Sequence, residues 1–385
     1  MPEAVIVEAI RSPVGKRNGG LSGVHPADLS AQVLNALVER AGVDPEIVDD
    51  VIWGCVMQAG EQSMDIARTS LLAAGWPESV PGVTVDRQCG SSQQSIHFAA
   101  AGVVAGHYDA VVAGGVESMS RVTMGASLAA GGNPFPKGFM DRYGVHPNQG
   151  IGAEMIAEQC GLDRTTLDEF SLGSHEKAAT AQDSGAFDDQ IVAIKVQEVG
   201  SETSVVLRDE GIRRGTPIEK MAQLKPAFKE DGVIHAGNSS QISDGSAAVL
   251  ITTHEKAKSL GLKPIAKIHT AVLAGANPVI MLTAPVPATQ KALKKSGLNI
   301  GDIGVFEVNE AFAPVPLAWL HDIGADEKNL NPNGGAIALG HPLGGSGARI
   351  MTTMLHHMRD KGIRYGLQTM CEGGGQGNAT IVELL

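Results

Sequence analysis

Asp86-Arg87-Gln88-Cys89-Gly90-Ser91-Ser92 lies between an apolar run and a helical pattern, and the expected fold can be built outward from it. The apolar run ends at Val85, and the helical pattern covers Ser92–Ala105. A second apolar run follows at Asp109–Gly114. These features predict a strand, a tight turn that carries a cysteine, a helix and a further strand, which is typical of βαβ units.

A similar order of features returns near the C-terminus. Gly340-His341-Pro342-Leu343-Gly344-Gly345-Ser346-Gly347 opens a helical pattern over Ser346–Lys361. A strand expected at Gly366–Met370 then leads into Cys371-Glu372-Gly373-Gly374-Gly375. Either two βαβ units resemble each other by chance, or the chain has two like halves that face each other. The second alternative places Cys89 near His341 and Cys371.

Short runs rich in Val and Ile alternate with helical patterns along most of the remaining chain, which predicts a layered α/β fold. Further strands are expected at Ala4–Ile10, Val51–Met57, Ala247–Thr252, Ile265–Ala274 and Ile303–Val308. Further helices are expected at Ala27–Arg40, His254–Leu260, Pro287–Lys295 and Ala311–Leu320. The stretch from about Ser120 to Ser243 interrupts this alternation with a loop-like segment and two helical stretches.

Composition excludes several classes of protein. The chain has 385 residues with a net charge of −12, and a nucleic-acid partner would require a basic face. No apolar run is long enough for a membrane span, and neither end carries an address signal, so a cytoplasmic location is expected. The four cysteines form no C-x-x-C pair, so no metal site is expected.

Four residues occupy positions suited to chemistry. Cys89 precedes a helix, whose N-terminal dipole is expected to lower the pKa of a thiol. His341, in a loop that opens a helix, could accept a thiol proton. Cys371 ends a strand before three glycines, whose N–H groups could face an oxyanion, and Asn309 follows a strand. For each of these residues, packing, hydrogen bonding or capping is the alternative.

The segment Arg208–Lys229 is locally basic, with six cations against three anions. It is either a solvated surface face or an anchor for a phosphorylated ligand.

Taken together, four segments resemble the motifs of the thiolase family, in the same order and over essentially the whole chain. They are Val85–Ser92, Asn309-Glu310-Ala311-Phe312-Ala313, the stretch from Asn333 to Pro342, and Cys371–Gly377. The resemblance implies a five-layer αβαβα fold of two similar halves with an inserted loop domain that binds coenzyme A. The expected boundaries are 1–119 plus 244–263 for the N-terminal half, 120–243 for the loop domain and 264–385 for the C-terminal half.

The resemblance also implies the roles of individual residues in an acetyl-CoA C-acyltransferase. Cys89 would carry the acyl group as a thioester, with its thiolate supported by His341, and Cys371 would act as the acid or base at the α-carbon. The N–H groups of Cys89 and Gly373 would form one oxyanion hole. His341, with a water held by Asn309, would form the other. Coenzyme A is implied as a substrate, and no tightly bound cofactor is expected.

Further residues resemble the family's segments around CoA and the acyl chain. The expected CoA contacts are Arg213 at the nucleotide end, Phe228, Gly237 and Ser240 along the pantetheine, and Ala311 and Phe312. At the acyl pocket, Asn148-Gln149 stands where short-chain biosynthetic members carry His-Met, and Gln88 stands where a leucine is common. These departures favour a 3-ketoacyl-CoA that is longer or bulkier than acetoacetyl-CoA, such as one with a sterol-type side chain.

The expected reaction is therefore the thiolysis of 3-ketoacyl-CoA in fatty-acid or sterol side-chain β-oxidation. The alternatives are an acetoacetyl-CoA-forming biosynthetic thiolase, a ketoacyl-synthase-like condensing enzyme, a non-catalytic acyl-CoA-binding relative, and a serine hydrolase that uses Ser346. A homodimer or homotetramer is expected, with Ser120–Tyr143 as the tetramer contact.

Overall fold

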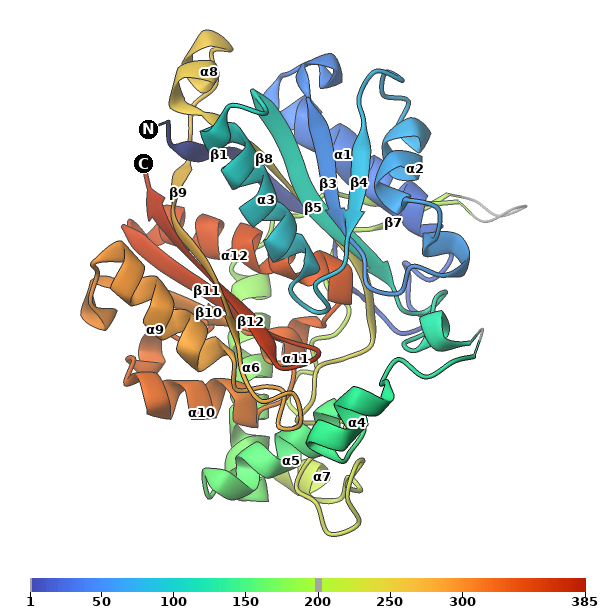
Figure 1. Ribbon diagram of the computed structural model, residues 1–385, viewed down its shortest axis with the longest axis vertical. Coiled ribbons are helices and arrows are strands. Elements are labelled where there is room, and N and C mark those ends of the chain that lie inside the picture. Colours follow the sequence, from blue (N-terminus) through green and yellow to red (C-terminus); the bar gives the residue numbers. More distant parts are fainter. Residues whose placement is uncertain (1, 130, 198–202) are drawn as a thin grey trace.

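One sheet of ten strands runs through both halves of the computed structural model, which describes residues 2–129, 131–197 and 203–385 (Figure 1). Its strands are β1 (Ala4–Arg11), β2 (Gly15–Lys16), β3 (Asp50–Gly54), β4 (Gly82–Val85), β5 (Ala110–Ser118), β8 (Ser243–Thr253), β9 (Ala266–Gly275), β10 (Val305–Val308), β11 (Tyr365–Glu372) and β12 (Gln376–Leu384). Their order is β10-β11-β12-β9-β1-β8-β5-β3-β4, with β2 paired to β8. The two parts of the sheet meet at β1 and β9 through only the pairs Val5–Lys267 and Ile6–Ala266.

Helices on three levels complete five layers. The helices of the two halves are α1 (Pro26–Ala41), α2 (Ile66–Ala73), α3 (Ser91–Ala105), α8 (His254–Ser259), α9 (Pro285–Ser296), α10 (Pro314–Ile323), α11 (Ala336–Leu339) and α12 (Ser346–Lys361). Helices α1 and α2 pack together on one part of the sheet, α3 and α12 lie between the two parts, and α9 and α10 lie on the outer side of the other (Figure 1). The five-layer αβαβα fold is thereby confirmed.

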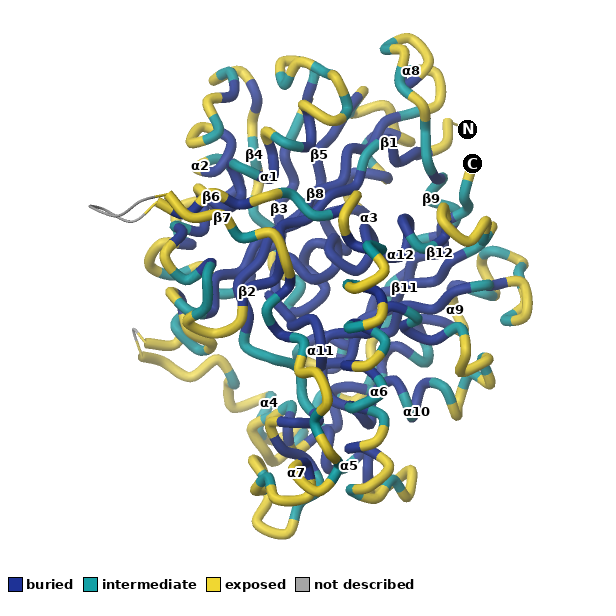
Figure 2. Tube along the Cα trace, turned by 180° about the vertical axis from the view of Figure 1, so that it is seen from behind, coloured by how far each residue is buried: buried dark blue, intermediate teal, exposed yellow. Residues whose placement is uncertain are grey.

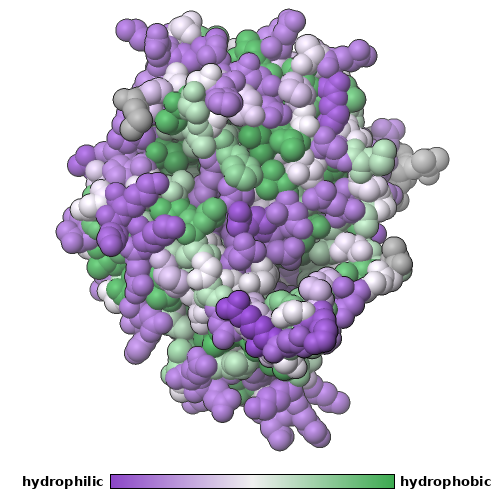
Figure 3. Space-filling view, viewed as in Figure 1, coloured by the Kyte–Doolittle hydropathy of each residue, from purple (hydrophilic) through white to green (hydrophobic). Residues whose placement is uncertain are grey.

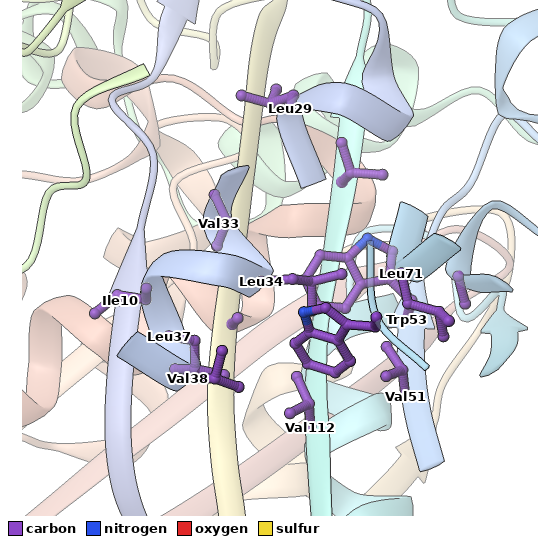
Figure 4. Packing of buried hydrophobic residues seen from close by; sticks show 14 of the residues in the cluster. Ile10, Leu29, Val33, Leu34, Leu37, Val38, Val51, Trp53, Leu71 and Val112 are labelled. Atoms are coloured by element: carbon purple, nitrogen blue, oxygen red, sulfur yellow. The ribbon is translucent and has the colours of Figure 1, made fainter. Parts of the chain in front are cut away.

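The outer layer of the first half is held by aliphatic side chains that recur along α1 at helical spacing. Leu34 points toward Trp53 on β3, whereas Leu37 and Val38 lie over β8, on the side of Ile10 from β1 (Figure 4). The helix begins with Pro26 after His25, whose side chain accepts from the Ala27 N–H, and it ends at Gly42 in the left-handed conformation. These caps and the apolar stripe explain why this segment forms a helix and which face it buries.

The middle layer brings the cysteine turn and the histidine loop together. Helices α3 and α12 approach so closely that a Cβ on Gly347 would collide with the backbone of Gln93. The Ala348 N–H donates to Ser92 Oγ at 2.9 Å, which ties the first turns of both helices to each other. Because both helices begin at the same place, the loops that precede them converge there.

The inserted segment forms a separate lobe beside the two halves (Figures 1 and 2). It holds α4 (Lys137–Tyr143), α5 (Gln149–Gln159), α6 (Arg164–Asp183) and α7 (Ile218–Ala222). The strand pair of the insertion, β6 (Ile194–Val196) and β7 (Ser204–Val206), lies instead beside the N-terminal half, where Ile194 and Val196 pack in the same core as α1 (Figure 2). Residue 130 and residues 198–202 of the predicted insertion lie outside the described residues. The domain boundaries at 119, 243 and 263 stay a prediction.

Most expected elements are present, with several differences. Strand β3 ends at Gly54 rather than Met57, because the N–H groups of Val56 and Met57 bond the buried Glu117 carboxylate instead of a strand. Helix α10 begins at Pro314 rather than Ala311, since Ala311 and Ala313 bond a neighbouring loop. Strand β12, which was not expected, forms a hairpin with β11.

Candidate active site

Cys89 lies on a strained turn directly before α3. Gln88, which precedes it, has φ of 48°, a conformation that non-glycine residues rarely adopt. Ser91 stabilises this turn, because its Oγ accepts from the Arg87 N–H at 2.9 Å and donates to the Gln88 carbonyl at 2.5 Å. Cys89 is 9% exposed among apolar side chains that include Met119 and Leu343.

The expected lowering of the Cys89 pKa by the helix N-terminus is wrong for this structure. Burial, followed by the negative charge of Glu372, raises the pKa of the Cys89 thiol to about 12. The thiol is therefore protonated at neutral pH and needs a group that accepts its proton.

His341 is held in a state that can accept a proton. The Ser346 hydroxyl donates to the Pro342 carbonyl at 2.8 Å, so its oxygen accepts from His341 Nδ1 at 2.6 Å. Nδ1 therefore carries the proton and Nε2 is left as an acceptor. The Asn309 amide nitrogen lies 3.4 Å from Nε2, and the Asn309 Oδ1 has no partner among the described residues.

Burial keeps the imidazole neutral. It lowers the pKa of His341 to about 3, with a smaller contribution from the positive charge of Arg349. The backbone N–H of His341 donates to Ser243 Oγ at 3.1 Å, which fixes the loop to the end of β8. A neutral ring with a defined tautomer suits a general base.

Cys371 is the second thiol at this place, and it is 1% exposed near the end of β11. Burial, followed by the charge of Cys89, raises the pKa of the Cys371 thiol well above its usual range, so the two sulfur atoms share one environment. The N–H of Gly373 has no acceptor among the described residues. A Cβ on Gly373 would lie 2.8 Å from Gln88 Oε1, which places this glycine turn against the turn of Cys89.

Glu117 on β5 joins the loop of His341 to the loop that follows β3, and the sequence analysis did not identify it. Its buried carboxylate accepts from the N–H groups of Val56, Met57 and Gly344 at 2.8–3.0 Å. A Cβ on Gly344 would lie 2.7 Å from the backbone of Gly54, so the glycines allow these loops to meet. Contacts across 227 residues of sequence leave no local signal.

A second group of predicted residues meets between α5, α6 and α10. The Ser240 N–H donates to the Ala311 carbonyl, and the Ala313 N–H donates to the Asn238 carbonyl, each at 2.9 Å. The rings of Phe228 and Phe312 stack edge to face, with centroids 5.8 Å apart. The predicted pantetheine contacts are thus adjacent, and Gly237 belongs to the same turn.

A buried network of hydrogen bonds fixes that turn. The His235 Nδ1 accepts from the Gly237 N–H at 3.0 Å, and its Nε2 lies 2.7 Å from Asp168 Oδ1. Asn238 also donates to Asp168, at 3.1 Å. The turn is therefore rigid before any ligand binds.

Arg213 lies at a cavity that fits the basic-anchor interpretation. The cavity has a volume of about 670 Å³ and is lined by Arg213, Ser240, Gln241, Lys16 and Arg17, among other residues. Lys16 and Arg17 come from the N-terminal half and have no ion-pair partner among the described residues. Sequence reasoning missed them because they are distant from the basic segment in the chain.

Asn148 and Gln149 have local contacts of their own. Asn148 caps α5, since its Oδ1 accepts from the N–H groups of Gly150 and Ile151 at 2.9 and 3.1 Å. The Gln149 amide lies 3.6 Å from the sulfur of Met124. Their position beside an acyl chain stays a prediction.

No helix within residues 2–129, 131–197 and 203–385 is long and apolar enough to cross a membrane. In the same part of the chain, no cluster of three His, Cys, Asp or Glu side chains could hold a metal ion.

The fold has two facing halves, with two cysteines and a histidine in the segments that join them. Sequence comparison assigns both halves to one class of proteins. Family models described as "Thiolase, N-terminal domain" and "Thiolase, C-terminal domain" match residues 4–255 and 262–384. The chain therefore belongs to the thiolase family.

Individual relatives cover the whole chain. A steroid 3-ketoacyl-CoA thiolase, FadA6, of Mycobacterium tuberculosis is 49% identical over 100% of this chain and 95% of its own length. A 3-ketoacyl-CoA thiolase of Saccharophagus degradans is 46% identical over 99% of this chain and 98% of its own. The crystal structure of the Bacillus anthracis acetyl-CoA acetyltransferase superposes with a TM-score of 0.92 at 39% identity, covering 100% and 99% of the two chains.

Proposed function

We propose that the protein catalyses thiolysis of a 3-ketoacyl-CoA by CoA, giving acetyl-CoA and an acyl-CoA shortened by two carbons. The observation that carries this proposal is the pair of buried thiols, Cys89 and Cys371, which act on each other, together with a neutral His341 in the loop that opens α12. One thiol can take the acyl group while the other moves a proton, which a single nucleophile could not do.

In the first half-reaction, His341 Nε2 accepts the proton of Cys89, and the thiolate attacks the 3-keto carbon. The bond between C2 and C3 breaks, which leaves a thioester on Cys89 and the enolate of acetyl-CoA. Cys371 gives its proton to C2, and acetyl-CoA leaves. The N–H groups of Gly373 and Cys89 form one oxyanion hole, and His341 with Asn309 forms the other, so that both the tetrahedral oxyanion and the enolate oxygen can be stabilised.

In the second half-reaction, the Cys371 thiolate takes the proton of the incoming CoA thiol. The CoA thiolate attacks the thioester carbonyl, and Cys89 leaves as a thiolate that recovers its proton from His341. At the end of the second half-reaction every proton has returned to the group that held it at the start. The side chains of this chain are therefore sufficient for the proton transfers, and CoA takes part as a substrate. Reversal of the same steps would give condensation.

The substrate class we propose is a 3-ketoacyl-CoA longer or bulkier than acetoacetyl-CoA, and the process is β-oxidation in the cytoplasm. The names of the relatives support this class, since one is a steroid 3-ketoacyl-CoA thiolase and another a 3-ketoacyl-CoA thiolase. The acetyl-CoA acetyltransferase with the same fold supports the biosynthetic alternative, which has the same active-site chemistry.

We also propose that the chain forms a homo-oligomer. Strand β4 is the edge of the sheet and bonds only to β3 among the described strands. Val83 on β4 and Phe98 on α3 are exposed apolar side chains. Figure 3 shows hydrophobic surface on the face of the molecule that carries α3. An open sheet edge next to an apolar patch is a typical surface for a second copy.

The acyl-enzyme intermediate tests the proposed reaction. The enzyme is mixed with a 3-ketoacyl-CoA without free CoA, and the cysteine peptides are analysed by mass spectrometry. We expect an acyl group on Cys89 in the wild type and none in Cys89→Ser, whereas Cys160→Ala removes an exposed thiol and keeps the adduct. Cys371→Ala should retain acylation of Cys89 by an acyl-CoA but lose condensation with acetyl-CoA. Absence of an adduct on active wild-type enzyme would contradict the mechanism.

A further inference from the structure

Glu372 is a buried carboxyl group that the proposed mechanism does not use. It is the last residue of β11, directly after Cys371, and its exposure is 0%. Neither of its carboxyl oxygens has a hydrogen-bond partner among the described residues. A buried carboxylate without hydrogen bonds is costly, so its presence at this place needs an explanation.

The carboxyl group lies against the turn of the nucleophile. Successive residues of a strand point to opposite faces, so Glu372 faces away from Cys371. A Cβ placed on Gly90 would collide with Glu372 Oε1, which means that the carboxyl group touches the residue that follows Cys89. The nearby amide of Asn378 donates to the Gly90 carbonyl at 3.2 Å.

Few positive charges offset the negative charge that this carboxyl group would have when ionised. Arg87, from the loop before α3, is the cation that acts on it, but its Nη1 donates to Gln376 at 2.8 Å and its Nε has no partner among the described residues. The other charged or titratable groups that act on Cys89 are acidic or thiols: Glu117 from β5, Asp86 from the same loop as Arg87, and Cys371 from β11. The imidazole of His341, in the loop before α12, is neutral.

Cys89 and Glu372 therefore form a pair that does not readily carry two negative charges. Two anions in one buried region repel each other, and such groups titrate as a pair. Burial raises the pKa of Glu372 to about 8, so the carboxyl group is mostly protonated at pH 7 and ionises above pH 8. In turn, the negative charge of Glu372 is the second-largest cause, after burial, of the raised pKa of the Cys89 thiol.

We propose that Glu372 is a positioning residue that controls the charge of the nucleophile: its carboxyl group stays protonated while Cys89 is a thiolate, and its ionisation makes that thiolate unfavourable. This inference rests on the proposed role of Cys89 as the nucleophile. It assigns to Glu372 an upper pH limit for the reactivity of Cys89.

Alkylation of Cys89 by iodoacetamide, a neutral reagent, tests this inference without any substrate. The rate is followed for the Cys89 peptide by mass spectrometry from pH 6 to 10 in the free enzyme. We expect wild type and Glu372→Gln to react at similar rates at pH 6.5, where both side chains are neutral. At pH 9 the variant should react about tenfold faster, the factor that corresponds to one pKa unit.

Glu307→Gln is the matched control. Burial also raises the pKa of Glu307 to about 8, and its Oε1 also has no partner, but it is not among the charges that act on Cys89. This variant should follow the wild-type profile, and so should Glu372→Asp, which keeps the charge.

The wild-type profile alone is a second measurement should Glu372→Gln fail to fold. The logarithm of its alkylation rate should flatten near pH 8 and then rise again. The inference would be overturned if the logarithm of the wild-type rate rose linearly with pH through this range. It would also be overturned if the ratio of the Glu372→Gln rate to the wild-type rate were the same at pH 6.5 and pH 9. Because alkylation requires no turnover, that result is distinguishable from a failure to form the acyl-enzyme.

Discussion

At the scale of single residues, the site depends on hydrogen bonds that set one tautomer. His341 can accept the proton of a thiol at Nε2 because its own proton is held on Nδ1. There it donates a hydrogen bond to the Ser346 hydroxyl, which in turn donates to the Pro342 carbonyl. The strained backbone of Gln88 similarly presents Cys89 at the start of α3. Local strain and defined tautomers are features of sites that are organised before the substrate binds.

The prediction of substrate size depends on Gln88, Asn148 and Gln149. If they border the acyl chain, kcat/KM should be higher for 3-ketoacyl-CoAs with long or sterol-type side chains than for acetoacetyl-CoA, because additional buried apolar area favours the transition state. Steady-state kinetics over a series of chain lengths measures this preference. A higher kcat/KM for acetoacetyl-CoA would contradict it and favour the biosynthetic alternative.

The identities of the reactive residues were accessible from the sequence, but their partners were not. Cys89, His341, Cys371 and Asn309 stand in short motifs, and their catalytic roles stay a prediction. The structure places the two thiols in one environment and Asn309 beside His341. Ser346 lies in such a motif, yet only the structure shows its bond to His341. The raised pKa of Cys89 depends on total burial and on Glu372, neither of which a local motif describes.

At the scale of elements, sequence patterns located most helices and strands and failed where tertiary contacts override local preference. Strand β3 ends early because the Glu117 carboxylate takes the N–H groups that a longer strand would use. Helix α10 starts late because Ala311 and Ala313 pair with the turn of Ser240 and Asn238. In both cases the competing partner is distant in sequence, so periodicity could not predict it.

Helix α3 contains a buried histidine that makes the fold sensitive to acid. The His97 Nε2 lies 2.7 Å from Thr380 Oγ1, and burial, with smaller effects of Arg87 and Lys295, lowers the pKa of His97 to about 3. The unfolded chain binds a proton at this side chain below about pH 6.5, whereas the folded chain does not, so stability falls as pH falls from about 6.5 toward 3.

His97→Gln, which keeps a polar group near Thr380, should remove this contribution. We expect the free energy of unfolding to lose about 1.4 kcal/mol less per pH unit between pH 6 and 4 than in the wild type. Urea denaturation at several pH values measures the two slopes. His321→Gln, at an exposed side chain in α10, should leave the slope unchanged, and equal slopes for wild type and His97→Gln would contradict the argument.

At the scale of the whole molecule, the two halves are joined mainly through the middle layer and the site. Only two residue pairs connect the two parts of the sheet at β1 and β9, whereas α3 and α12 pack against each other and against both. The reactive residues come from both halves, so the reaction requires that this layer stay closely packed. The five layers followed from the family resemblance, because element patterns alone predict a layered α/β fold without the number of layers.

The last prediction concerns the assembly of two copies of the chain through the open edge of β4. Burial of Val83 and Phe98 against a second copy, with pairing of the β4 edges, should give a particle of at least twice the chain mass of 39.9 kDa. Phe98→Asp places a charge in this patch and should lower the mass measured by light scattering, because a buried unpaired charge opposes association. Val205→Asp, at an equally exposed position on β7, is the control and should leave the mass unchanged. A wild-type mass of one chain, or an unchanged mass for Phe98→Asp, would show that this face is not the interface.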